Sequence, residues 1–191
     1  SFTELCIFDR ENNDSFVINY NDLLKSNYRF NAVGWIVEHS SISSIILSRL
    51  RRDPNINFLN SINNTIKCDS YDFSIYADGA TSNSRELHNI SNFKISYRQG
   101  CIVSKIMMRG IPNNIAYEIF TKTGPLALLP LGNGIFQVLW TESIQRCKDL
   151  VQSKNSEFLD ILATLLPGGI EPDCVITQKQ YFPLHFSLAS S

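Results

Sequence analysis

Two short stretches near the N-terminus alternate between apolar and polar residues, which is the pattern of half-buried β-strands. They are residues 4–8 and 15–19, and the polar residues 9–14 between them predict a β-hairpin. Residues 40–52 have a different period, because apolar side chains recur there at spacings of three and four. With Ser40 or Ser41 available as an N-cap and Pro54 beyond the end, this stretch predicts an amphipathic helix.

The second half of the chain predicts an antiparallel sheet followed by helices. The turn Gly132-Asn133-Gly134 suits a hairpin, since Gly and Asn tolerate positive φ. We expect strands at residues 95–109, 116–121, 126–131, 135–141 and 174–182, and helices at residues 142–154 and 156–166. Hairpin, helix, sheet and helices in this order favour an α+β fold, with an antiparallel or mixed β-sheet and helices on one side.

Composition narrows the class of protein. With 191 residues, 43% of them hydrophobic, the chain can bury one substantial core. The net charge of -1 gives no reason to expect a nucleic-acid partner. Scattered cysteines without a C-x-x-C pair, and histidines without companions at ligand spacing, predict reduced thiols and no metal site. Because the chain has neither a signal sequence nor an apolar run of roughly 20 residues, we expect a cytoplasmic protein, with peripheral contact at the inner membrane left open.

The stretch from Asp78 to Arg85 is the main candidate for chemistry. It follows residues 71–77, an apolar stretch that predicts a strand. Gly79 permits a tight turn, and Ser82 can cap a short helix that runs through Arg85. A carboxylate, a hydroxyl and a guanidinium would then meet at one corner. An Asp-Gly pair by itself is usually only a turn, so the functional interpretation depends on the residues around it.

The pattern D-G-x-x-S-x-x-R at Asp78, Gly79, Ser82 and Arg85 resembles the second dinucleotide-binding motif of the flavin-dependent aromatic hydroxylases, the class that includes p-hydroxybenzoate hydroxylase. The resemblance implies that these residues bind FAD. Asp78 would orient ribose or pyrophosphate groups, Arg85 would hold the corner together, and Ser82 would cap the helix. In that class NAD(P)H reduces the flavin, and the flavin supplies the oxygen chemistry.

A second resemblance is more specific. Residues 116–131, followed by Asn133-Gly134 and residues 138–141, are similar to the middle domain of ubiquinone-biosynthesis hydroxylases of the UbiH/VisC type, although Ile119 replaces the usual Arg. Val37-Glu38-His39 resembles the V-E-N segment of that family, with His39 in place of Asn. The resemblance implies that Glu38 and His39 lie beside the flavin. Capping of the following helix is the other interpretation of His39.

Two motifs of the family are missing from the sequence. None of its glycines has the G-x-G-x-x-G spacing that holds the pyrophosphate, and no Gly-Asp motif follows residues 181–184. The segment between Phe58 and Tyr71 is also shorter than in the family. We therefore expect the middle portion of such an enzyme, inactive by itself, with residues 1–88 as a partial edge of the FAD domain and residues 89–191 as a substrate-binding sheet domain.

The strand after Gly124 offers candidate substrate contacts. Ala127, Leu129 and Leu131 share one of its faces, and by family analogy this sheet faces the flavin. We expect these residues and Phe136 to line the substrate cavity. Such a cavity has no Arg to hold a carboxylate, so it would suit an aromatic, prenylated small molecule such as a polyprenylated phenol. Filling of an ordinary sheet-helix core is an equally good interpretation of each residue.

The leading hypothesis is an FAD- and NAD(P)H-dependent aromatic-ring monooxygenase of ubiquinone biosynthesis. A related flavoprotein, such as a phenol hydroxylase, a halogenase or a prenyl reductase, would share the fold without the substrate. A cofactor-free module that binds a lipid or a partner is the alternative from a different class. The sequence identifies no catalytic residue and indicates no oligomeric state.

Overall fold

The computed structural model describes residues 1–24, 30–58 and 71–189. The chain divides into two compact units. One is formed by Ser1–Ile36 and Ser96–His185, and the other by Val37–Ile95 and Phe186–Ser191. The first unit holds most of the sheet, and the second holds the Asp-Gly corner.

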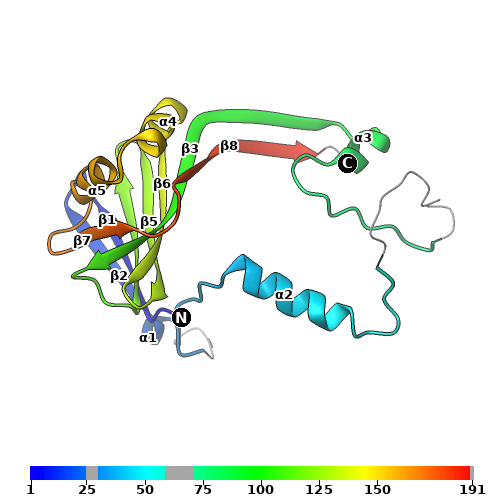
Figure 1. Cartoon of the computed structure of the whole chain (residues 1–191), viewed down its shortest axis with the longest axis horizontal. Coiled ribbons are helices and arrows are strands. Elements are labelled where there is room, and N and C mark those ends of the chain that lie inside the picture. Colours follow the sequence, from blue (N-terminus) through cyan, green and yellow to red (C-terminus); the bar gives the residue numbers. More distant parts are fainter. Residues whose placement is uncertain (25–29, 59–70, 190–191) are drawn as a thin grey trace. The chain divides into compact units, whose positions relative to one another are not determined.

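The first unit is built on a mixed β-sheet (Figure 1). Its strands are β1 (Glu4–Asp9), β2 (Asp14–Asn19), β3 (Asn92–Arg109), β4 (Ile115–Thr121), β5 (Gly124–Gly132), β6 (Ile135–Ser143), β7 (Glu171–Val175) and β8 (Gln180–Ala189). They lie in the order β2-β1-β4-β5-β6-β3-β7, and β8 pairs with β3. β1 runs parallel to β4, whereas β1–β2, β4–β5, β5–β6, β3–β6 and β3–β7 are antiparallel. The predicted N-terminal hairpin and the predicted strands from β3 to β6 are confirmed.

The turn between β5 and β6 has the backbone that its sequence predicts. Gly132, Asn133 and Gly134 have φ values of 96°, 53° and 73°, a region that Gly and Asn tolerate best. Just before this turn, Pro130 pairs with Phe136 whereas Gly132 pairs with Ile135. Leu131 is therefore the extra residue of a β-bulge.

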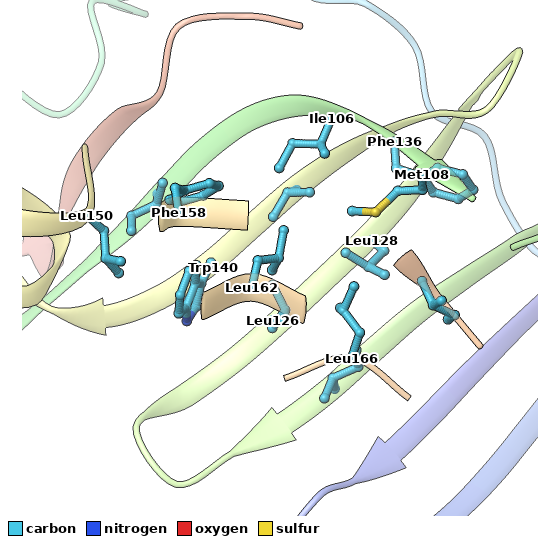
Figure 2. Close-up of a cluster of buried hydrophobic side chains, with 14 of the residues drawn as sticks. Ile106, Met108, Leu126, Leu128, Phe136, Trp140, Leu150, Phe158, Leu162 and Leu166 are labelled. Carbon is cyan, nitrogen blue, oxygen red and sulfur yellow. The ribbon is translucent and has the colours of Figure 1, made fainter. Parts of the chain in front are cut away.

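Two helices cover one face of the sheet and close the hydrophobic core. They are α4 (Ile144–Gln152) and α5 (Asn155–Ala163). Trp140 of β6 and Phe158 of α5 are among the largest fully buried side chains, with ring centroids 5.7 Å apart. Burying a large apolar side chain completely contributes about 1.5–3 kcal/mol. Figure 2 shows strand and helix side chains meeting in this cluster, so the predicted α+β fold with helices on one side is confirmed.

The remaining helices are α1 (Tyr20–Leu24), α2 (His39–Leu50) and α3 (Asn83–Leu87). α2 belongs to the second unit, and none of its side chains is buried. The predicted helix at residues 40–52 is therefore confirmed, although its apolar residues make no core of their own. Among the described residues, no helix combines the length and the apolar character needed to cross a membrane.

The predicted strand before the Asp-Gly corner is wrong. Residues 71–77 form no strand, and Phe73 and Ile75 expose 89% and 91% of their surface. A strand exists only where a neighbour accepts and donates its ladder hydrogen bonds. No strand of the described residues pairs with this stretch.

The last predicted strand, residues 174–182, is divided between two strands. β7 ends at Val175 and β8 begins at Gln180. Between them, Thr177 Oγ1 accepts a hydrogen bond from the Lys105 backbone N–H at 2.9 Å, and the Thr177 carbonyl accepts one from the Ser104 hydroxyl at 2.9 Å. The backbone N–H groups of Ile176 and Thr177 both donate to the Lys105 carbonyl, so the stretch stays bonded to β3 without the regular spacing of a ladder.

The first 36 residues pack with the sheet, because β1 pairs with β4 and β2 pairs with β1. The boundaries of the two compact units therefore differ from a single division at residue 88. The assignment of residues 1–88 to the edge of an FAD domain and of residues 89–191 to a substrate domain stays a prediction.

Candidate cofactor corner and substrate face

The Asp-Gly corner is closed by hydrogen bonds at the start of α3. Ser82 is the N-cap residue, and its Oγ accepts a hydrogen bond from the Arg85 backbone N–H at 3.0 Å. The Ser84 backbone N–H donates to Oδ2 of Asp78 at 3.0 Å. Two N–H groups that a helix leaves without partners in its first turn are therefore satisfied. The predicted capping role of Ser82 is confirmed.

These contacts also fix the charge of Asp78. Hydrogen bonds from the Ser82 hydroxyl and then from the Ser84 N–H lower the pKa of Asp78 from 3.8 to about 2. The carboxylate is solvent-exposed and remains ionised at any pH near neutrality.

Arg85 binds the turn from the other side. Its Nη1 donates to the Ala80 carbonyl at 3.3 Å, and its Nη2 donates to the Gly79 carbonyl at 3.2 Å. Gly79 has a φ of 82°, and an added Cβ would meet no atom within 4 Å. The structure thus brings Asp78, Gly79, Ser82 and Arg85 together in one corner, with Arg85 holding the turn as predicted.

Glu38 and His39 stand at the beginning of α2. Glu38 is the N-cap residue, but its side chain makes no capping hydrogen bond. Nδ1 of His39 lies 3.5 Å from the Ser43 hydroxyl, one turn further along the helix. Their proposed place beside a flavin stays a prediction.

The face of the sheet opposite α4 and α5 is called the second face here. Strand register defines a row across it, because residues paired across neighbouring strands point to the same side. The row consists of Ile7, Glu118, Ala127, Leu139 and Val103, on β1, β4, β5, β6 and β3 in turn. A second row contains Leu129, Gln137 and Lys105. Ala127 is buried and Leu129 is half-buried on this face.

Phe136 does not lie with Ala127 and Leu129. It pairs with Pro130, belongs to the core cluster, and is fully buried under the helices (Figure 2). The expectation that Phe136 shares a cavity wall with Ala127 and Leu129 is wrong, because the bulge at Leu131 shifts the pairing by one residue and so reverses the face. Leu131 itself is half-buried at that bulge.

Glu118 is a residue that the sequence analysis passed over. It is half-buried on the second face, and burial raises the pKa of its carboxyl group. The available signal was its position between Ala116 and Phe120, because it is the one charged residue among the alternate positions of that strand. Among the described residues, no cluster of three or more His, Cys, Asp or Glu side chains could hold a metal ion.

Comparison with known proteins gives relatives for part of the chain, and no family model matches it. The ubiquinone biosynthesis monooxygenase COQ6 of Mus musculus is 33% identical over 89 residues, which are 46% of this chain and 19% of that protein. COQ6 of Dictyostelium discoideum is 22% identical over 195 aligned positions, covering 83% of this chain and 39% of that protein. The uncharacterized protein slr1300 of Synechocystis is 29% identical over 110 residues, 58% of this chain and 27% of that protein. The chain thus spans less than two fifths of these relatives.

A solved structure extends the likeness to nearly the whole chain. The crystal structure of p-nitrophenol 4-monooxygenase PnpA from Pseudomonas putida matches 99% of this chain and 52% of its own, with a TM-score of 0.65 and 12% identity. At 12% identity this match shows a shared fold only. The similarity in sequence is to the COQ6 proteins. The resemblance that the motifs predicted is confirmed: part of the chain is similar in sequence to ubiquinone biosynthesis monooxygenases, and the chain shares the fold of about half of the p-nitrophenol 4-monooxygenase structure.

Proposed function

We propose that this chain supplies the substrate face and the Asp-Gly corner of an FAD-dependent monooxygenase that hydroxylates a prenylated aromatic ring in ubiquinone biosynthesis. The observation that carries the proposal is the division of the sheet into two faces. Helices bury one face, while the other presents the apolar row Ala127, Leu139 and Val103. Relatives named ubiquinone biosynthesis monooxygenase support the class of reaction.

The Asp-Gly corner fits a dinucleotide such as FAD. The Asp78 carboxylate is ionised and exposed, so it can accept hydrogen bonds from ribose hydroxyl groups. The open space at Gly79 lets a ligand approach the backbone of the turn, which Arg85 holds in place. When bound and reduced by NAD(P)H, the flavin would supply the oxygen chemistry.

The second face would bind and orient the ring. Ala127 is short, and Leu129, Leu139 and Val103 around it are half-buried, so a flat apolar ligand can cover this part of the sheet and exclude water from it. The row through Ala127 contains no cation that could hold a carboxylate, and Lys105 belongs to the neighbouring row. A neutral, greasy phenol fits this surface better than an aromatic acid.

The proposal is tested on the complete natural protein that contains this sequence. Purified protein should show the visible absorption of bound flavin after incubation with FAD. It should also convert a prenylated phenol into a hydroxylated product with NAD(P)H and oxygen. Protein that stays colourless with added FAD would overturn the proposal and leave the cofactor-free binding module.

Two variants separate the corner from the substrate face. Asp78→Ala should lose flavin more readily than wild type while its thermal unfolding changes little, and Asp72→Ala, an exposed carboxylate close by, serves as the matched control. Ala127→Phe should keep the flavin and lower the yield of hydroxylated product. Equal losses of flavin and of folding in Asp78→Ala would make the corner a structural turn only.

A further inference from the structure

Glu118 is a carboxyl group surrounded by apolar side chains. Across the strands it pairs with Ile7 of β1 on one side and with Ala127 of β5 on the other. Along β4, Ala116 and Phe120 occupy the same face, because side chains alternate along a strand. On the second face, Glu118 thus lies directly among apolar neighbours.

Within the described part of the chain, no hydrogen bond or ion pair joins the Glu118 side chain to another group. Burial alone raises the pKa of this carboxyl. The charged groups nearest to it on this face by strand register are Asp9, paired diagonally on β1, Asp14, the partner of Asp9 on β2, and Lys105, three strands away on β3. Asp9 already accepts a hydrogen bond from the Asn12 side chain, and three strand spacings alone separate the backbone of Lys105 from Glu118 by about 14 Å. An apolar ring that covered this carboxylate would remove it from water, which is costly unless the ligand itself supplies a hydrogen bond.

We propose that Glu118 recognises the ring hydroxyl of the substrate by accepting its hydrogen bond, and so selects a neutral phenol over ring acids and ring ethers. This inference rests on the proposed function, since it places the ring on the second face. The short side chain of Ala127 leaves room for the ring next to the carboxylate. An aromatic acid would bring a second negative charge against Glu118, which disfavours it.

Binding by the complete natural protein tests the inference without turnover. A prenylated phenol and its methyl ether are titrated calorimetrically in the absence of NAD(P)H. A hydrogen bond to a charged group corresponds to about 10- to 100-fold in affinity, so wild type should prefer the phenol by that factor. Glu118→Leu should remove the preference and bind the ether as well as wild type does. Glu11→Gln, an exposed acid in the first hairpin, should keep the preference.

Dependence on pH gives a second measurement. Phenol affinity in wild type should fall as the pH drops through the raised pKa of Glu118, because the protonated acid is a poorer acceptor, while ether affinity stays flat. Glu118→Gln should abolish this dependence while keeping the side-chain shape, which also controls for misfolding in Glu118→Leu.

The outcomes distinguish this inference from the proposed function. Equal losses of phenol and ether binding in Glu118→Leu, or a preference that persists in that variant, would overturn the role of Glu118. Loss of the preference in a protein that never hydroxylates the phenol would support the role and refute the reaction. Hydroxylation by a wild-type protein that binds phenol and ether equally well would support the reaction and refute the role of Glu118.

Discussion

The backbone N–H of Ser84 donates a hydrogen bond to Oδ2 of Asp78, six residues earlier in the chain, at 3.0 Å. Together with the Ser82 cap on the Arg85 N–H, this contact builds the Asp-Gly corner from its own residues. The Asp78 carboxylate is therefore held in position before the proposed cofactor binds. Preorganisation of this kind lowers the entropic cost of binding.

The same contact predicts a local response to acid. The pKa of Asp78 in the folded chain is about 2, below its ordinary value of 3.8. Its stabilisation of the corner is therefore fully present above about pH 4 and is lost as the pH falls toward about 2. The carboxyl carbon of Asp78 and the Ser84 amide should titrate together by NMR. Ser82→Ala removes the largest cause of the shift and should move the midpoint toward the ordinary value. A wild-type midpoint near 3.8 would contradict the hydrogen bonding described above.

Sequence patterns located the local structure of the corner and most of the sheet. Ser82 was identifiable because its oxygen can reach an N–H three residues later, a contact that needs no tertiary neighbour. β3 and β6 were identifiable because their buried and less buried residues alternate with a period of two, whereas β5 was identifiable as a short apolar run before a turn. Both signals depend on residues close together in the chain.

The errors came from tertiary relationships. Residues 71–77 have the composition of a strand, but composition does not supply the neighbour that completes a ladder. A two-residue turn at Asn133-Gly134 would pair Leu131 with Phe136 on one face, whereas the bulge pairs Phe136 with Pro130 on the other. The isolation of Glu118 depends on strand register across β1, β4 and β5, which periodicity alone does not reveal.

The core predicts a large contrast between two phenylalanines of the same unit. Phe158 is fully buried against Trp140, whereas Phe182 exposes 52% of its surface. Phe158→Ala should lower the free energy of unfolding by about 3–5 kcal/mol. Phe182→Ala should lower it by no more than about 1 kcal/mol, because little area is removed from the interior. Urea unfolding followed by Trp fluorescence measures both, and similar losses would place the core elsewhere.

Two glycines with positive φ should differ in their tolerance of alanine. Gly110 has a φ of 73°, and an added Cβ would lie 1.7 Å from the Gly169 carbonyl oxygen. Gly132 has a φ of 96°, with no atom within 4 Å of an added Cβ. Both alanines carry the backbone strain of about 1–2 kcal/mol, but Gly110→Ala must also displace the segment at Gly169. Chemical unfolding should give Gly110→Ala a much lower free energy of unfolding than Gly132→Ala. Equal values would contradict the close approach of Gly110 to the Gly169 carbonyl.

Lys179 predicts a dependence of stability on alkaline pH. Only 5% of its surface is exposed, its Nζ donates to the Ser153 carbonyl at 2.6 Å, and it lies 4.9 Å from the centroid of the Phe158 ring. Burial lowers the pKa of Lys179 below its ordinary value of 10.5, and the charge of Glu157 opposes that shift. The unfolded chain therefore binds more protons than the folded chain in the window between the lowered pKa and 10.5, so this residue makes folding more favourable as the pH rises through that window.

Lys179→Met keeps much of the side-chain volume and removes the titrating amine. The free energy of unfolding of wild type minus that of Lys179→Met should increase as the pH rises toward 10.5, and the subtraction cancels groups that titrate in both proteins, such as Tyr117. Arg stays charged throughout the window, so the free energy of unfolding of Lys179→Arg minus that of Lys179→Met should not increase with pH. A difference that is flat or falls with pH would mean that the ammonium group is as well solvated in the folded chain as in the unfolded chain, despite its position between Ser153 and Phe158.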